Sequence, residues 1–151
     1  MLGKTYDTQV CSAARALEVV GERWSLLIVR DVLFARATRF ADFQRLGIAT
    51  NILAKRLDSL VDSGILERHP SPEHPDRSNY TATRKGLDLA PVIIALTQWG
   101  DRWAAPDGPP ILYRHTGCGA AVTEQTTCAT CGHIADLTEI YVIHGPGMPP
   151  R

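Results

Sequence analysis

The spacing of apolar residues changes at Gly64, and this change limits the fold more than any other feature of the sequence. Before Gly64, apolar residues recur every three or four positions, which is typical of amphipathic helices. After it, the segments 65–69 and 79–83 are predicted to be strands of a hairpin, joined by a proline-rich loop over 70–78. Helical spacing then returns over 83–103, where Pro91 is expected to kink or restart the helix.

Helices are also expected before the hairpin. The first runs over 8–20 and is stopped by Gly21. The second covers 24–34 and is apolar nearly all round, as in a helix buried within a bundle. The third spans 39–45, with Thr38 as its N-cap. The inward-facing residues of this third helix are expected to be Phe40 and Phe43.

The fourth helix is predicted to begin at Thr50 and to reach Ser63. Thr50 is the expected N-cap, and Gly64 is the expected C′ residue that closes the helix. After the first helix, the predicted order is three short helices, a hairpin and a long closing helix. This is the order of a winged helix-turn-helix domain. The sequence therefore predicts a mainly α chain of the α+β class.

Length and proline placement predict two parts. The chain has 151 residues, enough for one ordinary domain or for a domain with a small appendage. A proline cluster at 106–110 separates the helical region from a cysteine-bearing tail. We expect a winged helix-turn-helix domain over 1–105 and a small extension over 106–151. No apolar run approaches about 18 residues and the N-terminus lacks the core of a secretory signal, so we expect a cytoplasmic protein without membrane contact.

The formal net charge of zero conceals a segregation of charge along the chain. Residues 36–86 carry nine basic and six acidic side chains, whereas residues 87–151 carry three basic and six acidic ones. The average over the whole chain hides this asymmetry between a basic middle and an acidic tail. Three extra charges alone do not establish a nucleic-acid partner.

The outer face of the fourth helix carries the residues most suited to reading DNA. On a helical wheel the leucines gather on one side, and Asn51 and Lys55 lie on the other. Asn can bond adenine, Lys can reach guanine or phosphate, and Thr50 can contact phosphate or a thymine methyl. Arg56 lies at the margin of this face, and the acidic residues follow only in the second half. A helix inserted N-terminus first would therefore bring its positive end and its polar groups to the groove.

The hairpin and the neighbouring loops add further basic groups. Arg68, His74 and Arg77 surround the hairpin tip with His69, which suits contact with the DNA backbone or minor groove. Arg39 is expected to contact phosphate beside the groove, together with Arg45 and Arg84. The competing interpretation is a solvated basic face without a ligand. Helix spacing, hairpin and charge gradient agree, so DNA binding is the favoured interpretation.

Residues 11–103 resemble the HxlR family of winged-helix regulators, a branch of the MarR-like group. The resemblance lies in Cys11 before ALEVVGERWSLLIVRDVLF, in RFADFQRLGIATNILAKRLDSLVDSGILER, and in Tyr80-Thr81-Ala82-Thr83 before Gly86 and Trp99-Gly100. It implies a transcriptional regulator, expected to be a repressor, that binds an inverted repeat in double-stranded DNA as a homodimer. In this family the dimer is usually built from the N-terminal helix and the closing helix. The apolar residues in excess of a small core fit that expectation: Val10, Leu17, Ile93, Leu96 and Trp99.

Cys11 lies at the start of the first predicted helix, where a thiol can have a lowered pKa and a higher reactivity. The family resemblance implies that a cysteine at this position senses oxidants or electrophilic small molecules. The alternative is a small apolar residue buried at the dimer seam, because free cysteine is among the most buried residue types. The sequence leaves both interpretations open.

The tail contains two closely spaced pairs of metal-binding residue types. His115-x-x-Cys118 is followed after nine residues by Cys128-x-x-Cys131. Two such pairs on tight turns can direct four ligands to one tetrahedral zinc ion, and glycines beside both turns give the backbone the freedom to do so. We therefore expect a small zinc-ribbon-like β extension that holds structural zinc. The alternative is a tail that packs on the first domain without metal.

Other functions have less support. The sequence contains no phosphate-binding glycine loop, nucleophile elbow or H-E-x-x-H helix, so we do not expect an enzyme. The main rival is a winged-helix module that binds protein rather than DNA. A small aromatic effector could also bind between the dimer seam and a tryptophan. Core packing is the favoured role for the three tryptophans, which are Trp24, Trp99 and Trp103.

Overall fold

The computed structural model describes residues 5–148. The chain divides into two compact units, Met1–Ile93 and Ile94–Arg151, and the boundary falls inside the last long helix. All of that helix after its first turn thus belongs with the extension, whereas the proline cluster had indicated a boundary near residue 105. The division into 1–105 and 106–151 stays a prediction.

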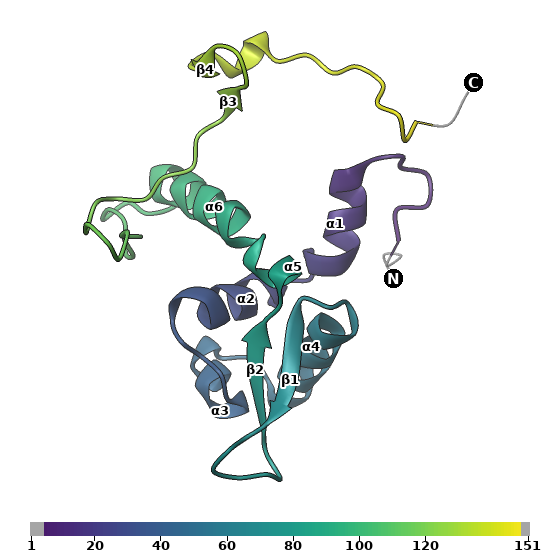
Figure 1. Cartoon of the computed structure of the whole chain (residues 1–151), viewed down its shortest axis with the longest axis vertical. Coiled ribbons are helices and arrows are strands. Elements are labelled where there is room, and N and C mark those ends of the chain that lie inside the picture. Colours follow the sequence, from purple (N-terminus) through teal and green to yellow (C-terminus); the bar gives the residue numbers. More distant parts are fainter. Residues whose placement is uncertain (1–4, 149–151) are drawn as a thin grey trace. The chain divides into compact units, whose positions relative to one another are not determined.

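The first unit begins with the helices expected from the apolar spacing (Figure 1). The first helix starts later than expected, at Ser12 rather than Thr8, with Cys11 as its N-cap. The third predicted helix forms as one α-helical turn followed by a short 3-10 helix. The bounds are α1 Ser12–Val20, α2 Ser25–Phe34, α3 Phe40–Phe43, η1 Gln44–Leu46 and α4 Thr50–Asp62.

Two predicted N-caps are wrong. The N-cap of α4 is Ala49, so Thr50 lies inside the helix, and the backbone of Ala49 makes this cap without a side-chain hydrogen bond. The N-cap of α3 is Arg39 rather than Thr38, and it forms a capping box with Asp42. The Asp42 carboxylate accepts the N–H of Arg39 at 2.8 Å, and it also accepts that of Thr38 at 3.0 Å. The C-terminal prediction for α4 is confirmed, since Gly64 follows the helix with a φ of 70°.

The wing is an antiparallel hairpin of β1 (Leu66–Pro70) and β2 (Ser78–Ala82), placed within one residue of the prediction. Thr83 connects the hairpin to the next helices. Its hydroxyl donates to the carbonyl of Gly64 at 2.6 Å and accepts the N–H of Gly86 at 3.1 Å, which starts α5 (Arg84–Leu87). The helix α6 (Ala90–Trp103) then begins one residue before Pro91, so the expected restart is confirmed.

The core of the first unit lies among α2, α4 and the wing. The inward-facing leucines of α4 and the aromatic ring of Phe43 are fully buried, and Phe43 meets Tyr80 edge-to-face at 6.2 Å between centroids. Burial of this apolar surface is the main force that holds the domain together. The buried cluster comprises Val20, Ile28, Val29, Ala37, Phe43, Ile48, Leu53, Leu57, Leu60, Ile65, Leu66, Tyr80 and Ile93.

The expected surplus of apolar surface is present, with one correction. Ile93 is 3% exposed and belongs to the core, because it faces inward on the first turn of α6. Val10, Leu17, Leu96 and Trp99 are 59%, 50%, 52% and 63% exposed. The expectation that the tryptophans pack in the core holds for Trp24, which packs partly buried against it. It is wrong for Trp99 and for Trp103, which is 70% exposed.

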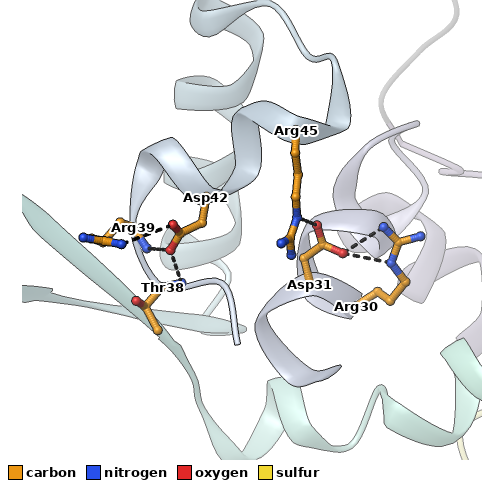
Figure 2. Close-up of polar contacts among 6 residues, drawn as sticks. All are labelled: Arg30, Asp31, Thr38, Arg39, Asp42 and Arg45. Atoms are coloured by element: carbon orange, nitrogen blue, oxygen red, sulfur yellow. Dashed lines mark hydrogen bonds and ion pairs between the residues drawn. The ribbon is translucent and has the colours of Figure 1, made fainter. Parts of the chain in front are cut away.

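A buried carboxylate joins the second helix to the helix-turn-helix (Figure 2). Asp31 on α2 is 2% exposed, and its Oδ1 accepts from Nε and Nη2 of Arg30 at 2.9 and 2.8 Å. Its Oδ2 accepts from Nε of Arg45, on η1, at 3.3 Å. The backbone carbonyl of Asp31 accepts the N–H groups of Ala35 and Ala37, each at 3.1 Å. One residue thus holds the end of α2, the following loop and η1.

The second unit contains the rest of α6, two tight turns and little regular structure. Gln98 on α6 exchanges hydrogen bonds with the backbone of Glu124, at 2.7 and 3.4 Å. An isolated bridge joins Arg114 to Ala121, and a short hairpin pairs β3 (Thr127–Cys128) with β4 (Gly132–His133). A short 3-10 helix, η2 (Leu137–Glu139), follows. The zinc-ribbon-like character of this extension stays a prediction.

Among residues 5–148, the structure shows no helix with the length and apolar composition that a membrane crossing needs.

We predict that Asp31→Asn destabilises the protein. The change keeps the side-chain size but removes the charge that two guanidinium groups share, and hydrogen bonds between charged groups are worth about 1.5–3 kcal/mol. The free energy of unfolding, measured by urea denaturation, should fall by about that amount. Asp76→Asn, in the exposed wing loop, is the matched control and should change it by less than about 0.5 kcal/mol. An equal effect of the two substitutions would contradict the anchoring role of Asp31.

Candidate nucleic-acid interface

The helix-turn-helix consists of α3, η1, a glycine turn and α4. Gly47 adopts a φ of 72°, which reverses the chain without the strain a side chain would bring. Leu53, Leu57 and Leu60 then bury the inner face of α4. The opposite face of α4 is thereby turned to solvent.

The outer face of α4 presents three polar side chains to solvent. Thr50, Asn51 and Lys55 are exposed, and within residues 5–148 their side chains form no ion pair or hydrogen bond. The first turn of α4 has no side-chain cap, so its N–H groups also remain available to an acceptor. Such groups at a helix N-terminus can bind phosphate oxygens.

Arg56 differs from its neighbours on α4. Its side chain is 15% exposed, and its Nη1 lies 3.3 Å from a carboxylate oxygen of Glu22. The sequence places Arg56 at the margin of the outer face, and the structure directs it towards the segment between α1 and α2. Arg56 is therefore a weaker candidate for DNA contact than Lys55.

On the strands of the wing, the basic side chains have internal partners. Arg68 pairs with Asp58 on α4 and lies over the Tyr80 ring at 5.5 Å. The hydrogen bond with Asp58 raises the pKa of the Arg68 guanidinium above its usual value. His69 lies 3.1 Å from the hydroxyl of Thr81. Arg68 therefore ties the wing to α4 as much as it offers charge to a ligand.

The basic residues of the wing loop are exposed to solvent. His74 and Arg77 are exposed, and the N–H of Arg77 donates to the carbonyl of His74 at 2.8 Å. The N–H of Ser71 donates to the carbonyl of Arg77, also at 2.8 Å, which closes the loop. No ion pair within the described part of the chain involves His74 or Arg77, so both stay available to a partner.

The arginines beside the helix-turn-helix form ion pairs with nearby carboxylates. Arg39 is exposed and lies 3.7 Å from Asp42, while Arg45 is held by Asp31 (Figure 2). Arg84 pairs with Asp88 at 3.2 Å. The N–H groups of Arg39 and Thr38 hold the pKa of the Asp42 carboxyl below its usual value, so Asp42 stays charged at neutral pH.

Sequence reasoning missed Arg36. This residue has a φ of 54° and lies exposed in the loop after α2. With Arg39 and Arg45 it lines a polar cavity of about 480 Å³ between this loop and the wing. Because Arg36 lies in a loop outside any periodic pattern, nothing in the sequence indicates that its side chain lines this cavity.

Cys11 is exposed at the N-terminus of α1 in the single chain. Its two interpretations, a reactive thiol and a residue buried at the dimer seam, both stay predictions. The N–H groups of Ala14 and Ala13 point to its sulfur and lower the pKa of the thiol, and Arg15 lowers it further. A lowered pKa raises the thiolate fraction at neutral pH, and the thiolate is the nucleophile.

The predicted metal ligands form two separate pairs. His115 Nδ1 lies 3.3 Å from Cys118 Sγ, and the free thiol of Cys131 forms a hydrogen bond with the sulfur of Cys128. The N–H groups of Cys131 and Thr130, together with that thiol, lower the pKa of Cys128. In the described part of the chain no three His, Cys, Asp or Glu side chains gather closely enough to hold a metal ion. The expected set of four ligands is thus not brought together in one chain.

Comparison with known proteins agrees with this geometry. Residues 19–108 match the family model described as HxlR-like helix-turn-helix. The chain is similar to an uncharacterised HTH-type transcriptional regulator of Mycobacterium tuberculosis, with 41% identity over 93% of this chain and 89% of that protein.

Two solved structures are also similar. One is PA1607, described as a candidate transcription factor, with a TM-score of 0.81, 36% identity and coverage of 93% of this chain and 99% of that one. The other is the redox regulator HypR in its oxidised form, with a TM-score of 0.55, 25% identity and coverage of 61% and 96%. The family match covers more than half of the chain and includes the helix-turn-helix and the wing. The chain belongs to the HxlR-like helix-turn-helix family and is a DNA-binding transcriptional regulator.

Proposed function

We propose that the protein represses transcription as a homodimer that reads an inverted repeat in double-stranded DNA through α4. The observation that carries the proposal is the outer face of α4, where Thr50, Asn51 and Lys55 are exposed and have no side-chain partner among residues 5–148. In the major groove Asn51 would bond a base and Lys55 a guanine or a phosphate. Thr50 and the free N–H groups of the first turn would contact phosphate.

The wing completes the interface in this proposal. His74 and Arg77 would meet the DNA backbone or minor groove, with Arg39 on a phosphate beside the groove. Arg68 and Arg56 would act mainly by holding the wing and α4 in place through Asp58 and Glu22. The protein would regulate by binding, without a catalytic step. It would act in the cytoplasm.

The homodimer is supported by exposed apolar side chains on α1 and α6. Val92, Leu96, Trp99 and Trp103 follow one another at spacings of four, three and four residues, which places them on one face of α6. They are between 48% and 70% exposed. Leu17 on α1 is 50% exposed. Large exposed apolar patches mark interaction sites, and a second copy would remove these from water.

Regulation through Cys11 is part of the proposal. The thiol is exposed at a helix N-terminus, and the similar protein HypR is described as a redox regulator. Oxidation or alkylation of Cys11 would change the dimer and, through it, the spacing of the two recognition helices. An aromatic small molecule bound near Trp99 would act on the same surface, and quenching of tryptophan fluorescence would detect it.

We predict that Lys55→Ala weakens binding to the operator by about 10- to 100-fold, because one groove or phosphate contact is worth about 1–3 kcal/mol. Electrophoretic or fluorescence titration at fixed salt measures the loss. Arg102→Ala, which removes one exposed positive charge in the last turn of α6, is the matched control and should change affinity less than about twofold. Equal losses for both variants would mean that α4 does not read DNA.

We predict that Leu96→Asp converts the dimer to monomers, because a charge would enter the apolar face that the second copy covers. Sedimentation velocity measures the mass. Leu87→Asp is the matched control, since Leu87 is also exposed, at 51%, but lies on α5. A dimer that survives Leu96→Asp unchanged would exclude this face of α6 from the interface.

We predict that Cys11 reacts with iodoacetamide at a lower pH than an ordinary cysteine. Because its pKa is lowered, the thiolate forms at lower pH, and the rate should reach half its maximum below pH 8.5 or so, the usual midpoint for free cysteine. Mass spectrometry of the peptide that contains Cys11 measures the rate in the intact protein. A midpoint at or above that of a free peptide cysteine would refute the activated thiol.

A further inference from the structure

Two turns of the second unit are built in the same way, and the DNA-binding function uses neither. In each, a short antiparallel bridge precedes a ligand residue, two spacer residues, a cysteine and a glycine with positive φ. The first turn is His115–Gly119, closed by the bridge between Arg114 and Ala121. The second is Cys128–Gly132, closed by the pairing of β3 and β4. The φ values of Gly119 and Gly132 are 72° and 82°.

The second turn directs its donors to one sulfur. The backbone N–H groups of Thr130 and Cys131 and the thiol of Cys131 all point to Cys128 Sγ. The hydrogen bond between the two thiols holds both cysteine side chains together at this turn. The shape of this turn depends on Gly132, because a side chain at its φ of 82° would be strained.

The first turn holds its two ligand atoms at a distance suited to one ion. His115 Nδ1 and Cys118 Sγ are 3.3 Å apart. Two such ligands of a tetrahedral zinc ion are separated by about 3.5 Å, given Zn–N of about 2.0 Å and Zn–S of about 2.3 Å. The imidazole lies against Gly117, where an added Cβ would come within 3.0 Å of its Cε1. The N–H of Gly119 donates to the carbonyl of His115 at 2.7 Å and closes the turn.

The extension lacks an apolar core that could replace a metal. No residue from 104 to 148 is buried, although this stretch contains several large apolar side chains. A segment of about 40 residues without a core usually depends on a metal, a disulfide or a partner for its stability. The four ligands, one imidazole and three thiolates, are a set that zinc prefers.

Each turn supplies two ligands, whereas structural zinc takes four. Within residues 5–148 of one chain the two turns do not form a group of three or more ligands. We propose that each turn is half of a structural Zn²⁺ site, and that His115 and Cys118 of one copy bind the ion together with Cys128 and Cys131 of the partner subunit. This inference rests on the homodimer proposed above, in which two such sites form.

The test compares the zinc content of the full chain with that of two variants. One variant carries His115→Ala and Cys118→Ser, the other Cys128→Ser and Cys131→Ser. Both are purified under reducing conditions, alone and as a heterodimer isolated through two different tags. The wild type should hold one zinc per chain, and each variant alone should hold less than about a tenth of that. The heterodimer should hold one zinc ion, because each variant supplies the turn that the other lacks.

Cobalt provides a second readout that does not depend on yield. Co²⁺ bound in place of zinc should give the intense visible absorption of a tetrahedral site with thiolate ligands in the wild type and in the heterodimer. Neither variant alone should give it. Sedimentation of the same samples shows whether the dimer is intact.

The outcomes separate the two proposals. A wild-type dimer without zinc, whether its thiols are free or joined as a disulfide, would overturn the zinc site and leave the dimer standing. Zinc in the wild type but none in the heterodimer would place all four ligands in one chain and overturn the sharing between copies. A zinc-loaded monomer would overturn the homodimer itself and the shared site with it.

Discussion

The buried carboxylate of Asp31 lies at the point where the scaffold meets the helix-turn-helix. It accepts hydrogen bonds from Arg30 on its own helix and from Arg45 on η1, and its carbonyl holds the loop that follows α2. Removing a charge from water is costly unless it is paired and hydrogen-bonded, and here two guanidinium groups do both. The position of η1, and through it of the turn and α4, follows from this pairing.

The same principle organises the basic middle of the chain. The excess of positive charge is not a diffuse field, because most of its arginines pair with carboxylates and join elements of the scaffold. Among the described residues of this segment, Arg36, Lys55 and Arg77 stay outside such pairs, and Lys85 donates to the backbone carbonyl of Ser63. A ligand would therefore meet a few free cations at defined places. The pairs are Arg39–Asp42, Arg45–Asp31, Arg56–Glu22, Arg68–Asp58 and Arg84–Asp88.

The sequence was sufficient for features that depend on local spacing. Periodicity and glycine placement predicted the helices, the wing and the end of α4, and the helical wheel predicted that Asn51 and Lys55 face outwards. The sequence was insufficient where tertiary contacts determine which side chains pair and which are buried. The partner of Arg56 is 34 positions away, at Glu22, and no local pattern encodes such a pair. The burial of Ile93 likewise depends on how the first turn of α6 meets the core.

The central claim is that α4 reads DNA in a two-fold arrangement, and selection of random duplexes by the purified protein at near-physiological salt tests it most directly. Sequencing of the bound pool should show an enriched inverted repeat whose half-sites lie about ten base pairs apart, because two recognition helices would enter successive major grooves. Binding should decrease as salt rises but should keep its sequence preference. A bound pool without an enriched sequence would contradict the account, and a protein partner of the winged helix would then be the better explanation.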